Sequence, residues 1–171
     1  MNPDRKNGSL KKIFLFVLVF FSISLFFISC RNLSKRIIWL EKTSVAMNWD
    51  DAVDYCKDLG GRLPTISELR TLIRNCRSTE YPRTILKDPW SWCGVTDSCL
   101  VRRQCWVREG DPCLGCSIDT SGRYSTLKDT GSFWSSSLRE GFVDFVWYVD
   151  FNDGGISNRH KSGKLYARCV R

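Results

Sequence analysis

The stretch NWDDAVDYCKDLGGRLPTISELRTLI, residues 48–73, decides how we expect this chain to fold. Its apolar residues at positions 49, 52, 53, 56 and 59 recur at the spacing of one helix face, and charged residues occupy the other face. Asn48 suits an N-cap, the aspartates that follow suit the helix dipole, and Gly60 or Gly61 supplies a C-terminal stop. The pattern predicts an amphipathic helix with Cys56 on its buried face.

A second helix is expected to begin near Thr65, because Thr65 and Glu68 form a capping-box pattern. Its expected apolar face consists of Ile66, Leu69, Leu72, Ile73 and Cys76. Cys56 and Cys76 therefore both point towards the core. Each is either a small buried hydrophobe or half of a disulfide, and the export features described next favour the disulfide.

The N-terminal segment differs from the rest of the chain in composition, because basic residues are followed by a long apolar run. Four basic residues precede the uncharged run IFLFVLVFFSISLFFIS, residues 13–29, as in an export signal. The run ends in Ser29-Cys30, which resembles the bacterial lipobox, where cleavage precedes a lipid-bearing cysteine; Phe27 departs from the usual leucine. We expect a lipoprotein signal peptide over residues 1–29, lipid on Cys30 and a tether over residues 30–36. The alternative is an uncleaved membrane anchor, and both interpretations place the rest of the chain outside the cytoplasm.

The cysteine count supports an oxidising compartment. The chain has nine cysteines, and eight remain if Cys30 carries lipid. Eight cysteines suffice for four disulfides, and such density is typical of exported domains. The formal charge is +8, and loss of residues 1–29 removes four basic residues and one acidic residue, which leaves +5. This mildly basic balance fits a polyanionic ligand or an anionic membrane surface, but also solubility alone.

Five further segments complete the organisation. Residues 36–42 read as a first strand, and residues 77–131 as a long irregular loop held by cross-links instead of a core of its own. SFWSSS at 132–137 and FVWYVDF at 145–151 read as strands, with a turn at Asn152-Asp153-Gly154-Gly155. KLYARCVR at 164–171 reads as a closing strand.

The blocks GGRLPTISEL, FWSSS and the terminal RCVR, with the inward cysteine of the first helix, resemble the C-terminal domain family of the Legionella collagen-like adhesin. This family is similar to the Fibrobacter succinogenes major paralogous domain. The resemblance covers residues 37–171 and implies an α+β, C-type-lectin-like fold. In that fold two helices pack on small antiparallel sheets, a long loop is stapled by disulfides, and the chain ends are adjacent.

The resemblance also implies that the first-helix cysteine bonds the last-strand cysteine, which here are Cys56 and Cys169. Such a bridge closes a loop of over a hundred residues, for which chain-entropy models give about 4–5 kcal/mol. The other six cysteines are Cys76, Cys93, Cys99, Cys105, Cys113 and Cys116. Six cysteines allow fifteen arrangements, so their pairing stays open.

The sequence contains few residue patterns that suit a metal site or a catalytic site. The calcium-binding sugar motifs of C-type lectins are missing, and Phe151-Asn152-Asp153 is the nearest echo of their Trp-Asn-Asp. Cys99, Cys105, Cys113 and Cys116 have zinc-like spacing, but disulfides compete for them. Cys113 and Cys116 also form a C-x-x-C pair, the basis for an alternative redox or formylglycine-generating-enzyme-like activity. His160 is the single histidine and reads as a solvated loop residue. We expect no metal, no cofactor and no catalysis.

Basic and aromatic residues in two loops form the remaining candidate site. Tryptophan faces stack on sugars, and arginines pair with sulfates, carboxylates or phosphates. The candidate ligand-binding residues are Trp90, Trp92, Arg102, Arg103, Trp106, Arg108, Arg159 and Lys161. The resemblance implies binding of sulfated glycans; the alternative is that the tryptophans form a miniature core. We expect a non-catalytic, lipid-anchored binding module of the bacterial envelope, with glycans or other polyanions and not nucleic acid as partners. A structural subunit of an envelope complex is a further alternative.

Overall fold

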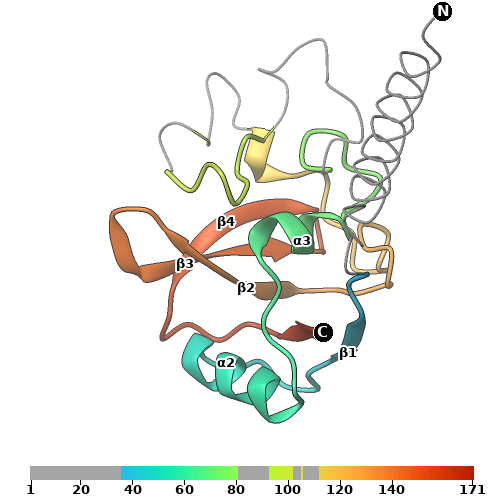
Figure 1. Ribbon diagram of the computed structural model, residues 1–171. Helices are drawn as coiled ribbons and strands as arrows, with labels where there is room; N and C mark the ends of the chain where they lie inside the picture. Colours follow the sequence, from blue (N-terminus) through green and yellow to red (C-terminus); the bar gives the residue numbers. More distant parts are fainter. Residues whose placement is uncertain (1–35, 81–92, 102–104, 106–111) are drawn as a thin grey trace, which may run out of the picture. The chain divides into compact units, whose positions relative to one another are not determined.

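The computed structural model describes residues 36–80, 93–101, 105 and 112–171. The chain divides into two compact units, Met1–Arg36 and Ile37–Arg171, and the second unit is the folded domain described below (Figure 1). Cys30 and the apolar run before it lie outside the described residues. Within the described ranges, no helix combines the length and apolar character needed to cross a membrane.

Helix α2, Trp49–Asp58, confirms the first sequence prediction. The Asn48 side chain caps it by accepting a hydrogen bond of 2.9 Å from the Asp51 amide. Ala52 and Cys56 are fully buried on its inner face. Gly60 adopts a φ of 68° just after the helix ends. At Gly61 any Cβ would lie 2.6 Å from the Val170 carbonyl oxygen, so a residue without a side chain is required there.

Helix α3, Ile66–Arg70, is shorter than the sequence predicts. Its capping box between Thr65 and Glu68 is present, but the helix ends at Arg70 and does not reach Cys76. The fully buried Arg70 side chain donates to the carbonyl oxygens of Thr79 and Cys93 at 3.0–3.2 Å, and also to that of Val95. These bonds hold the following loop against the helix end. Leu72, Ile73 and Cys76 are still buried, but they lie in an irregular segment after α3, in which Ile73 forms a β-bridge with Ser125.

Three antiparallel strands form the larger sheet, in the order β2–β3–β4. Strands β2 (Ser132–Arg139) and β3 (Phe142–Asp150) correspond to the two predicted aromatic strands. Strand β4 (Gly155–His160) was not predicted, and the expectation of a loop at His160 is wrong. Its sequence GISNRH has a single strongly strand-forming residue, Ile156, so pairing with β3 along its whole length determines its conformation.

A second, two-stranded sheet joins the two ends of the domain. Strand β1 (Trp39–Lys42) pairs antiparallel with β5 (Arg168–Val170). Ile38 and Arg171 exchange two backbone hydrogen bonds of 3.0 Å. Beside this sheet, the Arg168 guanidinium forms a buried ion pair with Asp129, with an N–O distance of 2.6 Å. In its described residues the domain is therefore an α+β fold with two α-helices, one short 3-10 helix (Pro112–Leu114) and two antiparallel sheets.

The larger sheet separates two hydrophobic clusters, because neighbouring residues of a strand point to opposite faces. Phe133 and Trp147 belong to the cluster that contains the residues of α3. Their neighbours Trp134 and Val146 belong to the cluster that contains the residues of α2. The sheet is thus covered on one face by α2 and on the other by α3 and the loops that follow it.

Four disulfides cross-link the domain. Cys56 in α2 bonds Cys169 in β5, the pairing that the resemblance implies. The remaining bridges are Cys76–Cys116, Cys93–Cys113 and Cys99–Cys105, and all three lie in or beside the loop of residues 77–131. The two cysteines of the C-x-x-C pair therefore belong to different bridges. The four thiolates of the zinc alternative are all consumed in disulfides.

Candidate functional site

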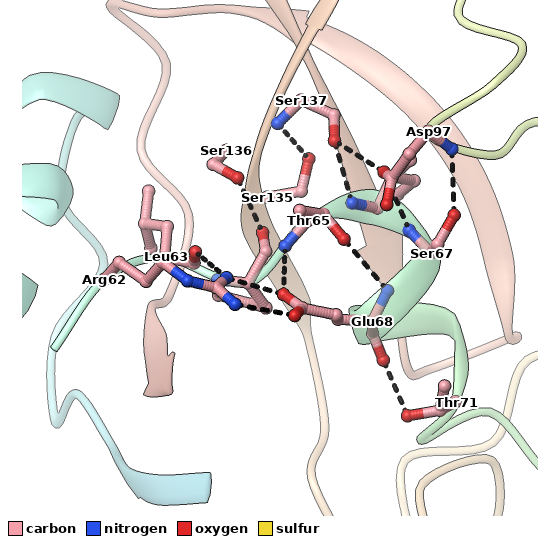
Figure 2. A network of polar contacts seen from close by, with 12 residues as sticks. Arg62, Leu63, Thr65, Ser67, Glu68, Thr71, Asp97, Ser135, Ser136 and Ser137 are labelled. Carbon is pink, nitrogen blue, oxygen red and sulfur yellow. Dashed lines mark hydrogen bonds and ion pairs between the residues drawn. The ribbon is translucent and has the colours of Figure 1, made fainter. Parts of the chain in front are cut away.

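Ser136 and Ser137 of the FWSSS block hold β2 to the start of α3 and to the segment just before it (Figure 2). Ser135 Oγ donates to the Trp147 carbonyl oxygen at 2.6 Å and accepts from the Ser137 amide. Ser137 Oγ accepts from the Ile66 amide at 2.9 Å and donates to Asp97 at 3.2 Å. The RLPTISEL and FWSSS blocks thus contact each other directly.

Asp97 and Glu68 complete the network in Figure 2. The Asp97 amide donates to Ser67 Oγ at 2.8 Å, which joins the cysteine-rich loop to the first turn of α3. Arg62 binds both Glu68 carboxylate oxygens at 2.6 Å. Hydrogen bonding by Arg62 lowers the pKa of Glu68, with burial opposing it and the Thr65 amide adding to it. Every group in this network has a structural partner, so we assign the network to the scaffold.

The turn between β3 and β4 contains Phe151-Asn152-Asp153, the segment most similar to the lectin Trp-Asn-Asp motif. Asn152 Oδ1 accepts from the Gly131 amide at 2.9 Å, and Asp153 Oδ1 accepts from the Gly155 amide at 2.6 Å. Asp150 accepts from Ser132 Oγ and from the Asn152 amide. Burial raises the pKa of Asp153, and the neighbouring Asp150 adds to this effect. These oxygens shape the turn, and among the described residues no group of three or more metal-ligating side chains is present.

Basic side chains gather where β4 ends and the chain turns towards β5. We call Arg159, His160, Lys161 and Lys164 the basic strand end. Arg159, His160 and Lys164 are exposed, and Lys161 is half-buried. The structure thus brings the predicted residues Arg159 and Lys161 together on one short segment. It also corrects the assignment of His160 to a loop, since His160 is the last residue of β4.

The basic strand end is held by aromatic side chains. Lys161 Nζ lies 4.6 Å from the centroid of the Trp49 ring, a cation–π contact. The Trp49 indole is itself fixed, because its Nε1 donates to the Ser135 carbonyl oxygen at 2.8 Å. The His160 ring packs edge-on against Phe145 at 5.5 Å between centroids. Sequence reasoning did not connect Trp49 with Lys161, because the two residues are brought together by the pairing of distant segments.

The side chain of Arg159 lies on the other face of β4 from His160 and packs over Gly163, where a Cβ would collide with it. Tyr148 lies on the same face, and burial raises the pKa of its hydroxyl while a hydrogen bond with Ser157 and the charge of Arg159 lower it. The remaining predicted ligand-binding residues, Trp90, Trp92, Arg102, Arg103, Trp106 and Arg108, lie outside the described residues. The described part of the candidate site is therefore the basic strand end with its aromatic supports.

Comparisons with known proteins place the chain in a family. No curated protein and no solved structure matches it. The family model described as the Lcl C-terminal domain matches residues 30–171, which include the whole folded domain. This match confirms the resemblance inferred from the RLPTISEL, FWSSS and RCVR blocks. The chain belongs to the Lcl C-terminal domain family.

Proposed function

We propose that the domain is a non-catalytic binding module of the bacterial envelope that recognises polyanionic glycans through the basic strand end. Membership of the Lcl C-terminal domain family suggests an extracellular, adhesin-like domain. Four disulfides are consistent with a location outside the cytoplasm. The proposal adds lipid anchoring at Cys30 and the glycan ligand. It also adds a C-type-lectin-like fold, for which the adjacent chain ends and the Cys56–Cys169 bridge are the supporting features.

One observation carries the glycan proposal: Arg159, Lys161 and Lys164 lie within six residues on a segment that is fixed at both sides. The Lys161 amide donates to the Asp144 carbonyl oxygen at 2.8 Å, and the Lys161 carbonyl oxygen accepts from the Trp49 amide at 3.0 Å. A fixed backbone reduces the entropy lost when cationic side chains order on a ligand. Sulfates and carboxylates spaced along a glycan can then contact several cations at once.

A glycan array with the purified full chain, read at low and at high salt, tests the proposal. We expect binding to sulfated glycans that weakens as salt rises, because the contacts are between exposed charges. The double variant Arg159→Ala/Lys161→Ala should lose about tenfold in affinity, equivalent to about 1.4 kcal/mol. The control Lys42→Ala/Lys57→Ala removes the same charge from exposed positions on β1 and α2 and should bind like the unmodified chain.

Two results would count against this function. Equal losses in the test and control variants would mean that net charge alone drives binding. Titration of the folded protein with a thiol reagent addresses the redox alternative at Cys113 and Cys116. The proposal expects no free thiol from these two cysteines, and a reactive pair would support the enzyme instead.

A further inference from the structure

One face of strands β3 and β4 carries polar side chains next to the basic strand end. The two strands pair in an unbroken register, in which Tyr148 lies opposite Ser157 and Asp150 opposite Gly155. Directly opposite residues, and residues two apart on one strand, share a face of a sheet. Tyr148, Asp150 and Ser157, which we call the polar row, therefore point to one side. Arg159, two residues after Ser157, points to the same side.

Helix α2 covers this side of the sheet unevenly. It contacts β2 and β5, and Trp134 of β2 is fully buried in the cluster that contains residues of α2. Tyr148, the partner of Trp134 on β3, packs against the same cluster but is only half-buried. Asp150 and Ser157 are half-buried as well. The polar row is therefore supported by the core beneath it and is still accessible to a ligand.

Hydrogen bonds order the polar row without using its full capacity. Asp150 accepts from Ser132 Oγ at 3.0 Å and from the Asn152 amide at 2.9 Å. An ionised carboxylate offers about four acceptor positions, so others remain for a ligand. Tyr148 and Ser157 share a hydrogen bond, and each hydroxyl can both donate and accept. The row therefore presents a fixed acceptor beside two hydroxyls, a combination that suits the hydroxyl groups of a sugar.

The polar row is acidic at one end, and the basic strand end continues it at the other. The charge of Asp150 adds to the effect of burial in raising the pKa of Asp153, because the two carboxylates are close together. Arg159 lies four residues beyond Gly155, the partner of Asp150, which is about 13 Å along the strand. A ligand chain that follows β4 therefore meets a cation at one point and a carboxylate about 13 Å away.

This arrangement distinguishes a hydroxyl from a sulfate at the acidic end. A sugar hydroxyl beside Asp150 donates a hydrogen bond to an ionised acceptor, which is stronger than a bond between neutral groups. A sulfate in the same place has no proton to donate, and the carboxylate repels it. The basic strand end favours anionic groups on the same chain. The two parts together therefore favour a glycan that carries both anionic groups and free hydroxyls.

We propose that the polar row is a hydroxyl-binding subsite that makes the domain selective for partially sulfated glycans. The basic strand end takes an anionic group, and the polar row takes free hydroxyls of a neighbouring sugar unit. The inference rests on the proposed function and deepens it, because it names the feature of the glycan that the site selects. Without the polar row, affinity would simply rise with the charge density of the polymer.

The experiment compares chondroitin sulfate, which keeps free hydroxyls, with the same polymer after chemical persulfation. Binding of the purified full chain to each immobilised polymer is measured, and we expect tighter binding to the partially sulfated form. Asp150→Asn should raise affinity for the persulfated form about fivefold, because the repulsion is removed. The asparagine oxygen can still accept from the Asn152 amide, so the turn is retained. Tyr148→Phe should weaken binding of the partially sulfated form about fivefold and leave the persulfated form unchanged.

Tyr166→Phe and Asp58→Asn are the matched controls, and both should bind the two polymers like the unmodified chain. Tyr166 is half-buried and packs on Phe133, on the other face of the sheet, and Asp58 is exposed at the end of α2. The subsite is overturned if the unmodified chain prefers the persulfated polymer, or if Asp150→Asn and Tyr148→Phe keep the unmodified ratio of affinities. Either result leaves the proposed function standing, whereas a chain that binds neither polymer contradicts both proposals.

Discussion

The hydroxyl of Ser137 donates to Asp97 Oδ1 at 3.2 Å, across a boundary between strand β2 and the cysteine-rich loop. The same hydroxyl accepts from the Ile66 amide at the start of α3. One small side chain therefore connects a strand, a helix and a loop that are far apart in the sequence. This contact explains why the serine run is a structural element.

Ser137→Ala should destabilise the domain by about 1–3 kcal/mol, because the Ile66 amide and Asp97 both lose a partner and Ser137 is buried. Ser136→Ala is the matched control, since Ser136 is half-buried and donates one hydrogen bond of 3.3 Å. Urea denaturation of both variants measures the difference. Equal stability of the two variants would show that the Ser137 network contributes nothing specific.

Removal of the Cys56–Cys169 bridge should cost more stability than removal of Cys99–Cys105. The two bridges span sequence separations of 113 and 6 residues. The chain-entropy model then gives about 5 and about 2 kcal/mol for the corresponding double alanine variants. Chemical denaturation under non-reducing conditions tests the ranking, and a reversed order would contradict it.

The Cys76–Cys116 bridge should open first under mild reduction. Cys116 is exposed, whereas Cys56 and Cys169 are fully buried. Thiol–disulfide exchange requires access of the attacking thiolate to a sulfur. Graded reduction with dithiothreitol, followed by alkylation and peptide mapping, should label Cys76 and Cys116 before Cys56 and Cys169. Labelling of Cys56 and Cys169 at the earliest time point would refute this order.

The contribution of Glu68 should depend on pH. Its folded-state pKa lies below its unfolded value, because the Arg62 guanidinium and the Thr65 amide bind the carboxylate. Its stabilisation is therefore complete well above about pH 4.3, the ordinary glutamate pKa, and is lost as the pH falls through the lower folded value. Glu68→Gln should be less stable than the unmodified chain at pH 7, and the gap should narrow towards pH 3.

Unfolding curves of both proteins across this pH range measure the gap. A gap that stays constant from pH 7 to pH 3 would mean that the ionised carboxylate is not the source of the difference. The buried Arg168–Asp129 pair is present in both proteins and cancels in the comparison.

Local sequence signals predicted the elements that depend on local interactions. The N-cap at Asn48 and the capping box at Thr65 act within one helical turn, and both are confirmed. The length of α3 could not be predicted, because its end depends on Arg70 binding carbonyl oxygens of residues 79, 93 and 95. Strand β4 was missed for a similar reason, since its partner β3 and not its own composition makes it a strand.

In the candidate site, too, the sequence predicted local features but not contacts between distant segments. The sequence indicated Arg159 and Lys161 by their charge, but not the Trp49 ring that holds Lys161. Phe142 and Val143 lie between the two predicted strands, residues 132–137 and 145–151, so their place at the start of β3 was not predicted. Their exposure depends on the position of the hairpin turn, which only the pairing of Arg139 with Phe142 defines.

The Cys56–Cys169 bridge has a mechanical consequence for any load applied to the chain before the folded domain. A pull on the chain before Ile37 can peel β1 from β5 and extend residues 37–55, but it then reaches a covalent bond. From that bond the load divides into two paths, one forward from Cys56 and one backward from Cys169. A domain closed in this way yields a short, fixed length of chain and then resists as a closed loop.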